Sequence, residues 1–415
     1  NAWRLPAELR PEVAYTPTPL YVQTQHTISE NFSAGMRAYG RGDFASAVSF
    51  LQSAATEVTN APDIYYYIAE AQRQQGQREA ALENYNLALD QQPDFAPALL
   101  GRARWLLQEE DTDLEAILAD LEAAVTADPL YGDARLELAH VYLLAGDEDQ
   151  AQETLAAVED LERGKDSPLF FLYRAQTHLL LGDPQAALQD AQKANQMDIS
   201  LLEAYPTLGE VYHQLGEDEK SIPPLAIYAK FASSDPKAPA WLGIAYARSG
   251  QAEQALEWLN KALEMDEQQA EAHAWRGLVL LEQGEAADAY QDFDQALILK
   301  GDLFIAALGR ARALLTLKYP NEAFDQYNRV IKLAESPAEQ GEYLYYYAQA
   351  LEQVGNVGAA LNAWKDLLEL PAAEIKFEWR QLAQKRVAAL SSPTPTPTLT
   401  RTPTLTRTPT RQTTP

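Results

Sequence analysis

Apolar side chains recur along this chain at spacings of three and four residues, which predicts a succession of amphipathic α-helices. The helical stretches come in pairs, and the pair recurs about every 34 residues from near Ser29 to near Ala372. Repeats of this length bury their apolar faces only against their neighbours, which is typical of a solenoid. The sequence therefore predicts an all-α protein built from about ten antiparallel helix pairs.

Each pair carries small residues where its two helices cross, because only a small side chain lets two helix backbones approach closely. The first helices provide this residue at Gly35, Ala69, Ala103, Ala139, Ala175, Gly209, Gly243, Gly277, Ala311 and Ala348. In the second helices a small residue such as Ala81 or Ala289 is followed four positions later by a large one, here Tyr85 or Phe293. This alternation predicts interdigitated packing.

A glycine stands at the end of the first helix in eight of the repeats. The left-handed backbone that ends a helix favours glycine, so we expect positive φ angles at these residues. They are Gly42, Gly76, Gly146, Gly182, Gly216, Gly250, Gly284 and Gly355. The third repeat has lost this glycine, and the ninth has Lys318, Tyr319 and Pro320 at its turn.

In the sixth repeat two prolines, Pro223 and Pro224, stand where the second helix should begin. Proline lacks the backbone donor that a helix interior needs. We interpret the pair as a delayed helix start, and a hinge is the alternative.

With small residues at two helix crossings, a glycine between them and prolines before the next unit, the chain resembles the tetratricopeptide repeat family. The resemblance covers residues 29–372 and implies a right-handed superhelical solenoid. Some members of the family hold the carboxylate of chaperone peptides with Lys, Asn and Arg on successive first helices. The matching positions here are Phe32, Met36, Tyr66 and Glu70, so we exclude this class of partner.

The segments that flank the repeats have different compositions. Residues 1–28 combine four prolines with apolar residues such as Trp3 and Tyr21. We expect them to form an extended arm that lies on the first repeat or on a neighbouring molecule. Residues 373–390 are predicted to form an amphipathic helix that caps the last repeat and leaves Phe377 exposed.

Residues 391–415 form a Thr-Pro-rich tail that can neither form a helix nor pack as a core. This composition indicates an extended chain, which is either a flexible linker or the O-glycosylated tail of an exported protein. The candidate glycosylation sites occupy every even position, at Thr394, Thr396, Thr398, Thr400, Thr402, Thr404, Thr406, Thr408 and Thr410.

The net charge of −27 argues against binding to nucleic acid or an anionic membrane and favours basic partners. The chain has no cysteine, and its five histidines fall in different repeats without metal-ligand spacing. It has no phosphate-binding loop and no apolar run long enough to span a membrane. We therefore predict no enzymatic activity, no metal and no cofactor.

Two runs of tyrosines lie on first helices, and three consecutive residues cannot share one helix face. At least one tyrosine of each run should therefore point into the concave groove, where it could stack on a peptide or sugar. The candidate contact residues are Tyr65, Tyr66, Tyr67, Tyr343, Tyr345 and Tyr346, together with Phe377, Trp3 and Tyr21.

Three hypotheses of function follow, all of them based on interaction with proteins. The first is an exported, extracellular or cell-surface structural protein whose copies associate head to tail into a filament through the arm or the tail. The chain begins with Asn1 and not Met, which we interpret as the sign of a processed product. The alternative is a monomeric adaptor, periplasmic or cytoplasmic, that holds basic or extended segments in its concave groove. A scaffold of an enzyme complex is the third.

Overall fold

The computed structural model describes residues 29–107, 113–159, 161 and 166–391, and these residues contain α-helices and no β-strand. The chain divides into two compact units, Asn1–Gln254 and Ala255–Pro415. The arm, the tail from residue 392 onward, and with them Trp3, Tyr21 and the candidate glycosylation sites lie outside the described residues.

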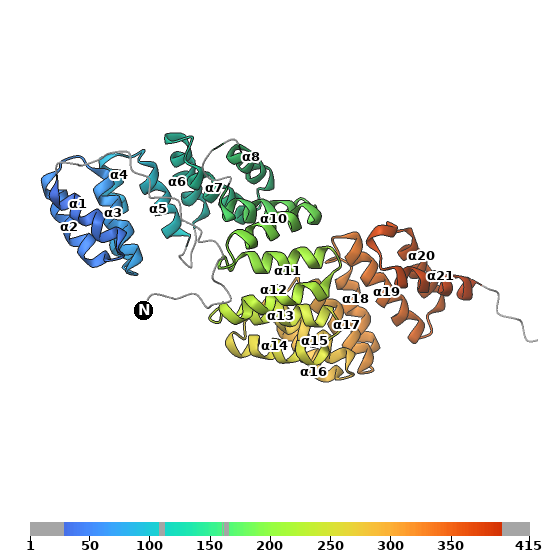
Figure 1. The fold of residues 1–415 in the computed structure, drawn as a ribbon. Coiled ribbons are helices and arrows are strands. Elements are labelled where there is room, and N and C mark those ends of the chain that lie inside the picture. Colours follow the sequence, from blue (N-terminus) through green and yellow to red (C-terminus); the bar gives the residue numbers. More distant parts are fainter. Residues whose placement is uncertain (1–28, 108–112, 160, 162–165, 392–415) are drawn as a thin grey trace, which may run out of the picture. The chain divides into compact units, whose positions relative to one another are not determined.

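The helices follow one another with short connections (Figure 1). In the first unit they are α1 (Glu30–Gly40), α2 (Phe44–Glu57), α3 (Pro62–Gln74), α4 (Arg78–Gln91), α5 (Ala96–Leu106), α6 (Leu114–Ala127), α7 (Gly132–Ala145), α8 (Glu148–Glu159), α9 (Pro168–Leu180), α10 (Pro184–Met197), α11 (Ala204–Gln214), α12 (Asp218–Phe231) and α13 (Lys237–Arg248). Helix α14 (Ala252–Met265) contains the unit boundary. The second unit continues with α15 (Ala270–Glu282), α16 (Ala286–Leu299), α17 (Phe304–Thr316), α18 (Pro320–Val330), α19 (Pro337–Gln353), α20 (Val357–Glu369) and α21 (Phe377–Ser391).

Within each unit, consecutive helices pack against each other from α1 to α13 and from α15 to α21. The first helices of successive pairs also touch, as in α3 with α5, α7 with α9 and α15 with α17. Each unit thus has a layer of first helices and a layer of second helices. This arrangement confirms the predicted solenoid of helix pairs.

The predicted contact of small with large residues is present at the helix crossings. A Cβ added to Gly35 would lie 2.7 Å from Cγ of Leu51, and one added to Gly277 would lie 2.9 Å from Cε1 of Phe293. Large side chains of the second helices also pack against the next repeat, which the sequence did not reveal. Gly101 faces the ring of Tyr85, and Gly309 faces the ring of Phe293, with no room for a methyl group.

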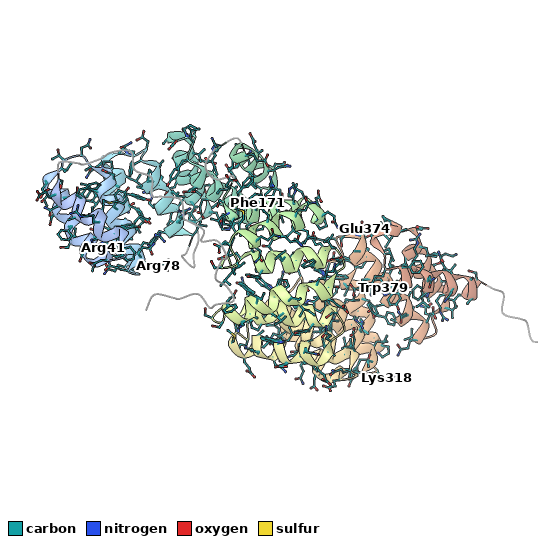
Figure 2. All side chains as sticks on the ribbon, viewed as in Figure 1. Arg41, Arg78, Phe171, Lys318, Glu374 and Trp379 are labelled. Carbon is teal, nitrogen blue, oxygen red and sulfur yellow. The ribbon has the colours of Figure 1, made fainter. Side chains whose placement is uncertain are left out.

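The eight turn glycines all have positive φ angles, between 71° and 89°, which confirms the expectation for the turns. In the ninth repeat Lys318 takes this position with a φ of 69° (labelled in Figure 2). A side chain with a Cβ is strained in this region of backbone conformation.

Replacing Lys318 with Gly is therefore expected to raise the free energy of unfolding by about 1 kcal/mol. Urea unfolding followed by circular dichroism would measure the change. Lys300 is a matched control, because it ends α16 with an ordinary φ of −140°. If Lys300→Gly stabilised the protein equally, relief of backbone strain would not be the cause.

The two prolines of the sixth repeat do not delay the second helix, so that interpretation was wrong. Helix α12 begins at Asp218, and Pro223 and Pro224 lie inside it. They are the sixth and seventh residues of the helix, beyond the first turn, so each removes one intrahelical hydrogen bond. Pro224 is buried among its neighbours. Burial of the ring thus accompanies the loss of two backbone donors.

The capping helix begins at Phe377 and not at residue 373, because a short 3-10 turn, Ala372–Glu374, precedes it. Trp379 stacks on Tyr345 of α19 with ring centroids 4.7 Å apart. Arg380 donates hydrogen bonds to the carbonyl oxygens of Leu368 and Leu370 at 3.0 and 3.1 Å. These contacts fix the cap to the last helix pair.

Candidate functional site

The first helices α3, α5, α7, α9 and α11 form one layer of the first unit, which we call the first-helix face. Each contacts the next in this order, and the second helices cover the other side of the layer. A repeat protein can present side chains from several helices on such a face to one extended partner.

A regular coupling joins neighbouring first helices on this face. Each first helix has one small residue at its helix crossing. The residue directly after it contacts a residue of the following first helix, and this second residue lies two positions before the small residue of its own helix. Three consecutive junctions between repeats use this pair of positions, and each uses different chemistry. The pairs are Arg104 with Glu137, His140 with Tyr173, and Gln176 with Thr207. We call these six residues the polar row.

The ion pair of the polar row is the most strongly coupled. Nε of Arg104 lies 2.7 Å from Oε2 of Glu137, whose side chain is only 12% exposed. Burial by itself raises the pKa of Glu137, but Arg104 and His140 outweigh it and lower this pKa to about 2. Burial likewise disfavours the charged Arg104, yet Glu137 raises the pKa of its guanidinium.

The rest of the polar row makes weaker contacts. The rings of His140 and Tyr173 stack with centroids 4.7 Å apart and planes 5° apart. Nε2 of Gln176 donates a hydrogen bond to the hydroxyl of Thr207 at 3.3 Å. Spacings of 31 to 33 residues between the partners would have revealed the row, but the sequence analysis followed only apolar and small positions.

Replacing Glu137 with Gln tests the charged pair through its pH dependence. Because the folded-state pKa is depressed, the pair stabilises the protein above the ordinary glutamate pKa of 4.5, and this contribution is lost as the pH falls towards 2. At pH 7 we expect the variant to be less stable by about 2–3 kcal/mol. Urea unfolding at pH 7 and pH 3 should show the difference shrinking on acidification. An equal difference at both values would contradict an ionic origin.

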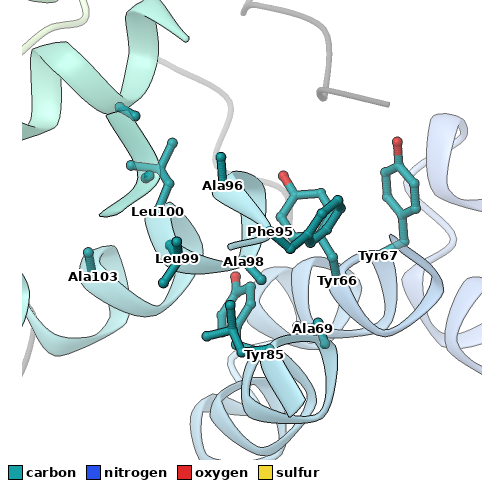
Figure 3. Packing of buried hydrophobic residues seen from close by; sticks show 14 of the residues in the cluster. Tyr66, Tyr67, Ala69, Tyr85, Phe95, Ala96, Ala98, Leu99, Leu100 and Ala103 are labelled. Atoms are coloured by element: carbon teal, nitrogen blue, oxygen red, sulfur yellow. The ribbon is translucent and has the colours of Figure 1, made fainter. Parts of the chain in front are cut away.

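Two of the tyrosines from the first run lie in the core. Tyr67 is fully buried and Tyr66 is 4% exposed. Figure 3 shows Tyr66 beside Phe95 and Tyr85, and the centroids of the Tyr66 and Phe95 rings are 6.1 Å apart. Tyr65 is partly buried and packs against the same core. A role of these tyrosines in ligand binding stays a prediction.

The second run connects the last repeats to the cap. Tyr343 is buried, whereas Tyr345 and Tyr346 are partly buried. The guanidinium of Arg312 lies 3.9 Å from the ring centroid of Tyr346, and Tyr345 stacks on Trp379. Phe377 is 70% exposed at the start of the cap. Their proposed contact with a ligand stays a prediction.

Three leucines that the sequence analysis did not select stand exposed at the ends of α7 and α9. Leu144, Leu180 and Leu181 expose 54%, 53% and 45% of their surface. We call these three residues the leucine rim. It adjoins the polar row, since His140 and Gln176 lie one turn before Leu144 and Leu180.

Arginines on the opposite side of the first helices bind the second helices. Arg102, Arg174 and Arg276 each hold both carboxylate oxygens of an aspartate in their own repeat, at 2.7 to 2.8 Å. Each also donates to a second helix of the preceding repeat, at Asn86, Glu159 and Asn260. These bridges are structural, because the buried aspartates have their partners within the fold.

In the described ranges, no group of three His, Cys, Asp or Glu side chains is arranged to hold a metal ion. Within the same ranges, each helix is too short or too polar to cross a lipid bilayer.

Comparisons with known proteins agree with this geometry. A family model described as tetratricopeptide repeat matches residues 38–104 and 106–169, and one described as TPR repeat matches residues 241–284. The TPR repeat-containing protein YpiA of Bacillus subtilis (strain 168) is 25% identical over 209 residues, which are 50% of this chain. The match spans about half of that relative, 48% of its length.

Among solved structures, the chain resembles one described as the APC/C hetero-tetramer Cut9-Hcn1. The TM-score is 0.56, and the alignment covers 87% of this chain and 83% of the other. At 15% sequence identity the likeness shows a common fold and nothing more.

Proposed function

The chain is a tetratricopeptide-repeat protein, and from this premise we propose that it is a protein-binding scaffold whose first-helix face holds a segment of another protein. Proteins of this family are generally non-catalytic scaffolds. The leucine rim is the observation that carries the proposal for this face. Adjacent apolar side chains about half exposed are a common mark of interaction sites.

The polar row supports the same face. Glu137, Tyr173 and Thr207 are buried, whereas Arg104, His140 and Gln176 are half-buried and offer a cation, an imidazole ring and an amide to a partner. An apolar contact supplies affinity, and polar groups beside it select the sequence of the partner. The face therefore combines both requirements of specific recognition.

Selection from a displayed library of random peptides tests this function. We expect the wild-type protein to enrich a family of related peptides, and we expect the variant L144Q/L180Q to bind them at least about tenfold more weakly. The control variant Ile298→Gln changes a 70% exposed apolar residue of the second unit and should bind like the wild type. Enrichment of no peptide, or equal binding by all three proteins, would contradict the proposal.

Self-association is a second candidate, and the exposed Phe377 favours it. A head-to-tail contact through the cap would extend into a filament if it did not close. Light scattering should then show a mass that rises with concentration and falls in Phe377→Gln. A constant monomer mass for both proteins would exclude this assembly. Export and glycosylation remain proposals. Recovery of the protein from the culture medium would test the first, and its intact mass would test the second.

A further inference from the structure

We propose that the leucine rim and the acidic turns beside it form a docking site for a basic amphipathic helix of another protein. This inference rests on the proposed scaffold function and names the class of partner that the first-helix face takes. The argument uses a comparison among the repeats, the spacing of the leucines and the charge around them.

The repeats themselves provide an internal comparison. Leu144 and Leu180 lie five residues after the small residue of their first helices. In the other eight repeats this position is polar or glycine, at Gly40, Gln74, Gln108, Gln214, Arg248, Glu282, Thr316 and Gln353. The fold thus requires no apolar side chain there. Only the fourth and fifth repeats depart from the polar choice, and they are neighbours.

The two leucines are spaced for a helix. Packed helices lie about 8–10 Å apart, and the coupling of His140 with Tyr173 offsets α7 from α9 by three residues, or about 4.5 Å. Leu144 and Leu180 are therefore roughly 10 Å apart. Residues i and i+7 of a ligand helix are separated by about 10.5 Å on one face. A single apolar stripe could contact both leucines.

The turns after α7 and α11 are strongly acidic, whereas the turn after α9 has one acid. Every residue of 147–149 and of 217–219 is Asp or Glu, and Asp183 occupies the turn between them. Asp147 and Asp183 cap the next helices through one oxygen each. Lys220 and His213 contact Glu217 and Asp218 at 2.8 and 2.6 Å. Capping needs one acid in each turn, and Glu148 and Asp149 add further negative charge in the first turn of α8, which the helix dipole also favours.

Charge decides between another protein and a second copy of this chain. Two copies that each carry a net charge of −27 repel one another, whereas a basic segment is attracted. Lysines or arginines that flank an apolar stripe would meet the acidic turns while the stripe covers the leucine rim. The partner is therefore a helix with leucine-type residues on one face and basic residues beside them.

A fluorescein-labelled synthetic peptide of 18 residues, with leucines in one stripe and lysines on both flanks, tests the inference with the full chain. Fluorescence anisotropy should show binding that weakens about tenfold in L144Q/L180Q and not in Ile298→Gln. The variant E148Q/D149N keeps Asp147 as the cap and should weaken binding severalfold at low salt. A second peptide with Glu in place of every Lys should bind at least about tenfold more weakly.

Each of the other results would overturn the inference. Equal binding of the two peptides would show that charge does not select the partner, and insensitivity to L144Q/L180Q would place binding elsewhere. A mass of the free protein that falls in L144Q/L180Q would identify a second copy as the occupant. The peptide library distinguishes this failure from a failure of the proposed function. If its enriched peptides still lost affinity in L144Q/L180Q, the scaffold function would hold, and only the basic amphipathic helix would be excluded as the partner.

Discussion

Replacement of Asp292 by Ala is expected to lower the stability of the second unit by about 3–5 kcal/mol, because it removes the buried carboxylate of an ion pair and leaves Arg276 without this partner. Asp292 is 7% exposed at its side chain and accepts hydrogen bonds from Nε and Nη2 of Arg276 at 2.8 and 2.7 Å. Its Oδ1 also lies 2.9 Å from Nδ1 of His273. Burial raises the pKa of Asp292, but Arg276 and His273 outweigh it and lower this pKa.

The same helix offers a matched control. Asp294 lies two residues further on, is 42% exposed at its side chain and pairs with Arg310 at 2.6 Å. Removing this exposed partner should cost no more than about 1 kcal/mol. Urea unfolding of both variants at pH 7 would measure the two losses. Equal losses would show that burial of the aspartate does not determine the energy of these bridges.

The helix pairs and their turns could be predicted because each depends on nearby residues. A left-handed turn needs glycine whatever surrounds it, so Gly146 and Gly284 identified their turns correctly. The exception at Lys318 shows that another residue can adopt the same conformation at such a turn. Local chemistry thus predicts the glycine turns, whereas it does not predict the same conformation at Lys318.

Contacts between repeats were harder to predict. Gly101 and Gly309 lie two residues before the small positions that we selected, and their role depends on the ring of the preceding repeat. Arg104 and Glu137 are 33 residues apart and become partners only when α5 and α7 lie together. The pattern within one repeat contains neither relation.

The tyrosine runs show a limit of periodicity arguments. Consecutive residues point in different directions around a helix, which led us to expect a groove-facing member. Helix α3 packs against α2, α4 and α5, so several of its faces are covered. Tyr66 and Tyr67 can therefore both be buried although they are adjacent. A helix in the middle of a solenoid has fewer free directions than an isolated amphipathic helix.

Phe293 is expected to contribute as much stability as Asp292, but through packing. Its side chain is fully buried between Gly277 of its own repeat and Gly309 of the next. Phe293→Ala should cost about 3–5 kcal/mol, since it removes the contacts of the ring and leaves a cavity. Gly309→Ala should cost about 1–3 kcal/mol, because the added methyl group overlaps the ring.

The double variant separates this steric contact from two independent losses. Without the ring, the methyl group of Gly309→Ala enters the vacated space and gains the helix propensity of alanine. The double variant should therefore be more stable than the sum of the single changes predicts, by about 1–3 kcal/mol in urea unfolding. Gly358→Ala is the control, because a Cβ there meets nothing within 4 Å. If the two losses of stability were strictly additive, Phe293 and Gly309 would not couple the two repeats. A close contact between them requires that the cost of the added methyl group disappears when the ring of Phe293 is removed.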